Sequence, residues 1–297
     1  TRQLTLKSGL RLSGFATAAS KQYGNIEPRL ALNYLLNSNL SFKASYSRMA
    51  QYLHQVKFIN LSFLDPWFPS NQYVRPQTAD QVSAGFTAAL FNGQVSLTNE
   101  YYYKWLHHQL EYRNGASFLF IDENYHQRLT VGRGRSYGAE WQLEKNKGNL
   151  TGWISYTLSW ANRQFPDLNN GKSFPFNFDR RHVMVAVLLH QLPRNWTVSA
   201  NFTYRTGEAI DLAVGRFFIY GINFGDPQIV PQYAAQNSFR MPAYHRLDAG
   251  FIKRFTSKKR LQSELAVSFY NLYSRRNAFF IYYEDVKDKE NRTVTYR

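Results

Sequence analysis

The histidine pair His107-His108, beside Trp105, comes closest in this sequence to a metal-binding arrangement. Imidazole nitrogens are good ligands for zinc and related metals. Adjacent residues of a strand point to opposite faces, so the pair would need ligands from other strands to hold an ion. Ser, His and Asp all occur, but we expect no hydrolase triad, and paired glycosidase-like carboxylates cannot be placed from the sequence. We therefore predict no catalytic residue, no metal site and no cofactor.

Aromatic residues in long connections are the candidate binding residues. Apolar rings in exposed loops need a physical reason, which is either contact with a ligand or partner, or packing of one loop on another. The sequence leaves both reasons open. As the substrate-binding set we predict Trp67, Phe68, Tyr73, Phe217, Phe218, Tyr220 and Tyr233.

The elements that position these residues are strands with a period of two. In residues 137–144, aromatic and aliphatic residues alternate with polar residues and glycine, and residues 150–160 repeat the pattern after Asn146-Lys147-Gly148. A helical period would mix the two sets, so the segment is predicted to be a β-hairpin. Strands of roughly 14 residues are much longer than the usual five or six and suit a tilted membrane crossing. One apolar face and one hydroxyl-rich, charged face predict a barrel wall between lipid and a wet lumen.

The same alternation along the chain predicts an all-β fold of about twelve antiparallel strands, the last one incomplete. The expected strands are 3–14, 28–36, 40–47, 78–90, 95–112, 132–144, 150–160, 183–189, 196–205, 247–251, 261–269 and 293–297. Short links alternate strictly with long connections, as periplasmic turns and extracellular loops do in outer-membrane barrels. The first strand should therefore run from the periplasm outward. The longest loops, Leu53–Pro76 and Gly207–Met241, should lie outside, cap the lumen and contact a substrate or surface partner, stiffened by Pro66, Pro69 and Pro227. The alternative is a mobile surface loop that only shields the barrel.

Composition agrees with a barrel. Aromatic residues make up 17% of the 297 residues, yet no run approaches the 18 apolar residues of a spanning helix. Cysteine is absent, which excludes disulfides and thiolate metal sites. The net charge of +16 is spread over turns and loops without a basic helix or stripe. We therefore expect anionic lipid, including lipopolysaccharide, as the partner of these charges and no nucleic acid.

The alternation also assigns side chains to faces. Facing lipid, we predict Leu30, Tyr34, Phe42, Ala139, Leu143, Val185, Val198 and Leu265. Aromatic residues near strand ends are expected in interfacial girdles: Trp141, Tyr156, Trp160, Trp196 and Tyr204. Four arginines, Arg180, Arg181, Arg205 and Arg246, are expected to point into the lumen, where they would pack against a plug or contact substrate.

The block GRGRSYGAEW…EKN…GNLTGWISYTLSWANRQF…LNNGKSFPFNFDRRH resembles the C-terminal barrel half of TonB-dependent outer-membrane receptors, in the branch with a carboxypeptidase-regulatory-like domain before the plug. EPRLALNYLLNSNLSFKASYSRMAQYLH, RMPAYHRLDAGF and FYNLYSRRNAFFIYYE extend the resemblance over essentially the whole chain. The resemblance implies a bacterial outer-membrane barrel of roughly 22 strands around a plug. It also implies import of a bulky nutrient of the siderophore, cobalamin, glycan or peptide class, driven through TonB.

The sequence departs from this family pattern in lacking a plug, a TonB contact segment and an aromatic C-terminal residue. We expect residues 1–297 to be the C-terminal part of one barrel domain, with a self-closing twelve-strand barrel as the less favoured alternative. The first functional hypothesis is a transport protein that uses its own plug and TonB. The alternative is a structural or docking barrel for surface lipoproteins or other subunits. An enzyme is a distant third.

Overall fold

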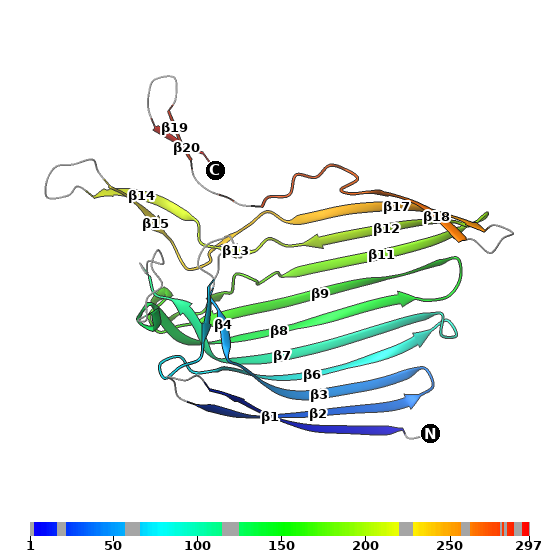
Figure 1. The fold of residues 1–297 in the computed structure, drawn as a ribbon, viewed down its shortest axis with the longest axis horizontal. Helices are drawn as coiled ribbons and strands as arrows, with labels where there is room; N and C mark the ends of the chain where they lie inside the picture. The colour runs from blue at the N-terminus through cyan, green and yellow to red at the C-terminus, as the bar shows by residue number, and fades with distance from the viewer. Residues whose placement is uncertain are drawn as a thin grey trace.

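The structure, a computed structural model, describes residues 3–16, 22–56, 66–114, 125–219, 228–256, 262–279, 281, 284–287 and 293–296. One large curved antiparallel sheet dominates it (Figure 1). None of the helices among the described residues has the length and apolarity to cross a membrane.

Eleven long strands follow one another across the sheet in chain order, apart from short strands in the loops. They are β1 (Leu4–Phe15), β2 (Tyr23–Asn37), β3 (Leu40–Gln51), β6 (Gln77–Leu90), β7 (Val95–Tyr112), β8 (Leu129–Lys145), β9 (Leu150–Gln164), β11 (His182–Leu192), β12 (Trp196–Arg205), β17 (Tyr244–Thr256) and β18 (Gln262–Phe269). The short β10 (Phe174–Pro175) adds a twelfth by pairing with β9. The predicted all-β fold of about twelve antiparallel strands is confirmed.

The long connections contain structure of their own, and Figure 1 places it at the end of the sheet opposite the short turns. Two-stranded pairs form between β4 (Leu53–Gln55) and β5 (Trp67–Pro69), between β13 (Ala209–Ile210) and β16 (Phe239–Arg240), and between β14 (Ala213–Ile219) and β15 (Gln228–Tyr233). Two 3-10 turns, η2 (Tyr125–Arg128) and η3 (Asn169–Gly171), complete this end. The alternation of short turns and long connections thus divides the sheet into a turn end and a loop end.

The segment expected to be the last wall strand has a different place. β20 (Thr293–Tyr296) pairs with β19 (Glu284–Lys287) in a separate hairpin and not with β18. Alternating residues predict a strand but not its partner, so this assignment was wrong. Among the described residues, β1 and β18 lie at the two edges of the sheet and do not pair. The self-closing twelve-strand barrel is therefore not the observed arrangement.

The strand register assigns every wall residue to a face, because directly paired residues of an antiparallel sheet share one side. One continuous row of paired residues is apolar: Leu97, Leu143, Ile154, Ala186, Phe202 and Leu247. The adjacent row on the opposite face is Thr98, Gln142, Ser155, Val185, Thr203 and Arg246. The first face carries exposed Leu, Ile and Phe along β1 to β3, whereas the second carries Ser, Thr, Gln and charge. The apolar face is the lipid side and the polar face is the lumen side.

The lipid-facing predictions hold for Leu30, Tyr34, Phe42, Ala139, Leu143, Val198 and Leu265, which all fall on the apolar side of the register. Val185 was assigned wrongly, because it pairs with Ser155 and Thr203 on the polar face. β11 is apolar on both faces, with Val183, Val185 and Val187 alternating with Met184, Ala186 and Leu188. Apolar and polar residues therefore do not alternate in this part of β11, and its sequence does not show which face meets lipid.

Candidate functional site at the loop end

The β4–β5 hairpin packs against β7 and β8 at the loop end of the sheet. Their buried side chains form a small hydrophobic core of Val56, Phe68, Val74, Leu110 and Leu129, bordered by Tyr112 and Tyr125. The Phe68 ring stacks on that of Tyr125, with 4.6 Å between ring centroids. Burial raises the pKa of the Tyr125 hydroxyl above its ordinary value. This first loop cluster fixes the segment around β4 and β5 on the barrel wall.

His54 is a polar residue of β4 that lies opposite Phe68 in the first loop cluster. It is completely buried, and its Nε2 is 2.9 Å from the hydroxyl of Ser70. Its Nδ1 has no hydrogen-bond partner among the described residues. Burial disfavours the imidazolium and lowers the pKa of His54 to about 4. His54 is therefore neutral at physiological pH.

Asn71 ties the first loop cluster to its neighbours. Its side-chain oxygen accepts hydrogen bonds from the backbone N–H groups of Tyr73 and Val74, both at 2.8 Å. Its amide nitrogen donates to the hydroxyl of Tyr125 at 2.6 Å, and its carbonyl accepts from the hydroxyl of Tyr23 at 2.8 Å. The turn after β5 is therefore joined both to η2 and to the start of β2.

The aromatic residues predicted to bind substrate do not share one environment. Trp67 and Tyr73 are exposed, at 60% and 58%, and the Tyr73 ring stacks on His126 with 3.9 Å between centroids. Phe68 is 5% exposed and belongs to the hydrophobic core of the first loop cluster, as expected for the packing of one loop on another, the second reason that the sequence left open. Phe217 and Tyr233 are exposed on β14 and β15. The backbone of Phe218 lies in β14, while Tyr220 and Pro227 lie outside the described residues.

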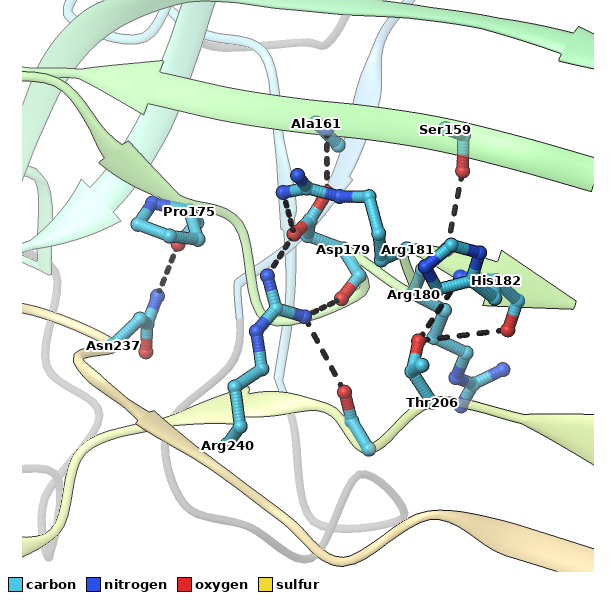
Figure 2. Close-up of polar contacts among 11 residues, drawn as sticks. Ser159, Ala161, Pro175, Asp179, Arg180, Arg181, His182, Thr206, Asn237 and Arg240 are labelled. Atoms are coloured by element: carbon cyan, nitrogen blue, oxygen red, sulfur yellow. Dashed lines mark hydrogen bonds and ion pairs between the residues drawn. The ribbon is translucent and has the colours of Figure 1, made fainter.

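A second loop cluster joins the β9–β11 connection to the β12–β17 connection, and its centre is Asp179 (Figure 2). Asp179 is 1% exposed. Its Oδ1 accepts a hydrogen bond from the backbone N–H of Ala161 at 2.7 Å, and its Oδ2 pairs with the guanidinium groups of Arg181 and Arg240. Arg240 also donates to the backbone carbonyls of Asp179 and Gly207. One buried carboxylate thus connects β9, the start of β11 and β16.

Further polar contacts reinforce the second loop cluster. Arg180 pairs with Glu208, and the amide of Asn237 donates to the carbonyl of Pro175 and to Asn177, both at 3.0 Å. Asp211 accepts from the backbone N–H of Asn237 at 2.5 Å. In the β9–β11 connection, Phe165, Leu168 and Phe174 form a second buried hydrophobic cluster. The two connections are therefore one packed unit.

The four arginines predicted in the lumen divide into two pairs. Arg205 and Arg246 lie on the polar face of the register, where Arg205 is over the ring of Tyr244 and Arg246 pairs with Asp248 at 2.9 Å. Arg180 and Arg181 belong to the second loop cluster instead. No local pattern predicts this cluster, because Asp179, Arg180 and Arg181 lie in the β9–β11 connection whereas their partners Arg240 and Glu208 lie in the β12–β17 connection.

The histidine pair lies at an irregularity of β7. His107 and His108 occupy a bulge of β7, where the register with β8 passes from Leu106 to Gln109, and His107 pairs with Asp80 at 3.4 Å. No group of three or more metal-ligating side chains occurs in the part of the chain that the structure describes.

One pentapeptide of the chain has the spacing of a nucleophile elbow. Gly134-Arg135-Ser136-Tyr137-Gly138 matches G-x-S-x-G. A nucleophile elbow requires a sharp strand-to-helix turn. These residues instead lie within β8, paired along β9. The match therefore reflects strand alternation and not a hydrolase site.

A curved antiparallel wall with one lipid-facing side, short turns at one end and structured loops at the other defines an outer-membrane β-barrel protein. The sequence model described as TonB dependent receptor-like, beta-barrel matches residues 1–272. The chain belongs to this family and is a multi-pass protein of the bacterial outer membrane. No curated protein matches its sequence significantly.

Solved structures share the fold at low sequence identity. The ferric-catecholate import receptor Fiu from Escherichia coli K12 has a TM-score of 0.62 at 17% identity, with 94% of this chain and 39% of that chain covered. The ferripyoverdine receptor of Pseudomonas aeruginosa has 0.62 at 13% identity, covering 95% and 34%. The unliganded ferric citrate transporter FecA has 0.59 at 14% identity, covering 99% and 40%. The chain therefore spans well under half the length of these proteins.

Proposed function

We propose that residues 1–297 form the C-terminal part of the barrel of a TonB-dependent receptor that imports a bulky nutrient across the outer membrane. Family membership supports this class of transport. The three similar structures are named as receptors or transporters for iron chelates, and we extend that substrate class to this chain as the first to test. The receptor's own plug and TonB would be its partners.

The observation that supports a binding role is that exposed aromatic residues of the first loop cluster lie next to buried or hydrogen-bonded residues of the same loop. Trp67 extends from the same short strand whose Phe68 is buried in the loop core. The backbone N–H of Tyr73 donates a hydrogen bond to the side-chain oxygen of Asn71, and the Tyr73 ring stacks on His126. Rings that are already ordered cost little conformational entropy when a ligand packs on them. A shielding loop would not require this order.

The test is growth of a bacterial strain that depends on the full-length receptor for one supplied nutrient. Candidates from the iron-chelate, cobalamin, glycan and peptide classes are supplied in turn. For the nutrient that supports growth, Trp67→Ala with Tyr73→Ala should lower uptake at least tenfold, with normal receptor abundance in the outer membrane. Trp196→Ala, which removes an exposed tryptophan at the turn end, is the control and should leave uptake unchanged.

If no nutrient requires the receptor, the transport proposal fails. Recovery of a surface lipoprotein with the receptor, lost in the same double variant, would then establish the alternative role as a docking barrel.

A further inference from the structure

Two adjacent rows of paired residues cross the lipid side of β3, β6, β7, β8 and β9 near the loop end. The first row is aromatic apart from one valine: Tyr46, Val82, Tyr103, Tyr137 and Trp160. Its rings stack, with 5.7 Å between the centroids of Tyr103 and Tyr137 and 5.3 Å between those of Tyr137 and Trp160. Such a belt marks the level of the membrane interface.

The next row toward the loops is polar and charged, although it lies on the same outward face. It consists of Arg48, Asp80, Trp105, Arg135 and Asn162. One pair further along, Arg133 lies opposite Gln164 on this face. Charged residues on the lipid side of a barrel are destabilising at the midplane but are tolerated at the interface. These residues therefore lie at the level of the lipid headgroups.

The charges of this row are not balanced. The carboxylate of Asp80 pairs with Arg48 at 3.7 Å and with His107 at 3.4 Å, and it accepts a hydrogen bond from the hydroxyl of Tyr46 at 2.8 Å. Arg135 is exposed and makes no ion pair with any described residue. Arg133 is also exposed, and its Nε donates to the amide oxygen of Gln164 at 3.1 Å, with no acidic partner in the described part of the chain. Two guanidinium groups on β8 thus keep unsatisfied charge at the headgroup level.

A phosphate group is the anion that fits this arrangement. Arginine presents a planar fork of donors that binds phosphate oxygens in pairs, and it tolerates partial dehydration better than lysine does. Trp105, exposed at 43%, adjoins Arg135 and offers an amphipathic ring at the boundary between acyl chains and headgroups. The long-loop end faces outward, so the lipid supplying this phosphate belongs to the outer leaflet.

We propose that Arg133 and Arg135, with Trp105 beside them, form a binding site on the outer wall for the phosphate of an outer-leaflet phosphorylated glycolipid. The site is separate from the loop aromatics and does not depend on nutrient import. The lipid phosphate would balance the positive charge of Arg133 and Arg135, and this contact would hold the barrel at a fixed depth in the membrane.

The test titrates the purified full-length protein in detergent with lipid A and measures the bound fraction by native mass spectrometry. At about 1 kcal/mol for each arginine near a membrane surface, R133Q/R135Q should weaken the apparent Kd about 30-fold. R133K/R135K keeps the charge but loses the fork and should show a smaller loss. Lys104→Gln is the matched control, because Lys104 is adjacent to Trp105 in sequence but lies on the polar face opposite Ser136. It should bind lipid A as the parent does.

The proposal is overturned by an unchanged Kd in R133Q/R135Q, by an equal loss in Lys104→Gln, or by equal binding of dephosphorylated lipid A by the parent protein. Full displacement of lipid A by millimolar inorganic phosphate would also overturn it, since the site would then be one for free anions. Thermal unfolding of each variant shows whether the barrel has remained folded, and a loss of binding counts for the proposal only where unfolding matches the parent.

Discussion

Arg240 donates hydrogen bonds both to the carboxylate and to the backbone carbonyl of Asp179, 61 positions earlier in the chain. Asp179 is buried, whereas the Arg240 side chain is 36% exposed. The two residues therefore join connections that leave the barrel wall at different strands.

Asp179→Ala should release the β12–β17 connection from the β9–β11 connection. Removing the carboxylate leaves Arg181 and Arg240 without their shared acid and Ala161 without a side-chain acceptor. Loss of a buried ion pair costs about 3–5 kcal/mol, which partial solvent screening of the arginines reduces to about 2 kcal/mol of local stability. Hydrogen exchange should accelerate at residues 209–212 and 236–240, with the central wall strands unaffected.

The control for this change is Asp167→Ala, which removes the exposed ion pair to Arg113. Exposed pairs contribute little, so exchange at the same residues should not change. Unaltered protection in Asp179→Ala would contradict the bridging role of the carboxylate.

Acidification should open the first loop cluster through His54. Its folded-state pKa is about 4, below the unfolded value of 6.5, so the unfolded segment binds the extra proton. The stabilisation is complete above pH 6.5 and is lost as the pH falls toward 4, by up to about 3 kcal/mol. Limited proteolysis with an acid-tolerant protease should cleave between residues 53 and 76 faster at pH 4.5 than at pH 7. His54→Phe cannot titrate and should remove most of this difference; cleavage that keeps the full pH dependence would assign it to another group.

Val198→Arg should impair the barrel more than Ser199→Arg does. Val198 pairs with His190 and Phe251 on the lipid side, whereas Ser199 pairs with Leu189 and Gly250 on the lumen side. An arginine facing lipid near the midplane costs about 2–4 kcal/mol, while one facing a wet lumen keeps its hydration. Folding titrations into lipid vesicles measure the difference, and equal costs for the two variants would contradict the face assignment.

Deleting residues 217–233 should leave the barrel folded and inserted but abolish uptake or partner capture. The deletion removes most of the β14–β15 hairpin, which pairs only with itself among the described strands, and so spares the wall. Membrane insertion is checked by protease protection, and function by the nutrient-dependent growth described above. Import at the parental rate would mean that this hairpin is only a surface cover.

The sequence predicted the wall well because alternation is a local property. Leu143, Val198 and Leu265 each alternate with polar neighbours, and each lies on the expected face. Val185 failed because β11 is apolar on both sides. The placement of Thr293–Tyr296 in the wall was wrong for a different reason. Its pairing with β19 is set by where the chain turns, which the composition of the segment does not show.

The candidate site could be predicted only in part. Aromatic residues in long connections were recognisable, but burial separates Phe68 from Trp67, one residue away, and burial depends on contacts with β7 and β8. The pairing of Asp179 with Arg240 had no local signal at all. The charged row of Arg48, Asp80, Trp105 and Arg135 emerges only when the register aligns residues from four strands.

The bridge at Asp179 has a consequence for engineering. Loops of barrel receptors are attractive units to exchange when a new specificity is wanted. Here the β9–β11 and β12–β17 connections share one buried acid, and a Cβ at Gly207 would overlap the backbone carbonyl of Met241 where the second connection begins and ends. Transplanting either connection alone would leave unmatched charges on its host, so a successful chimera has to carry both as a single cassette.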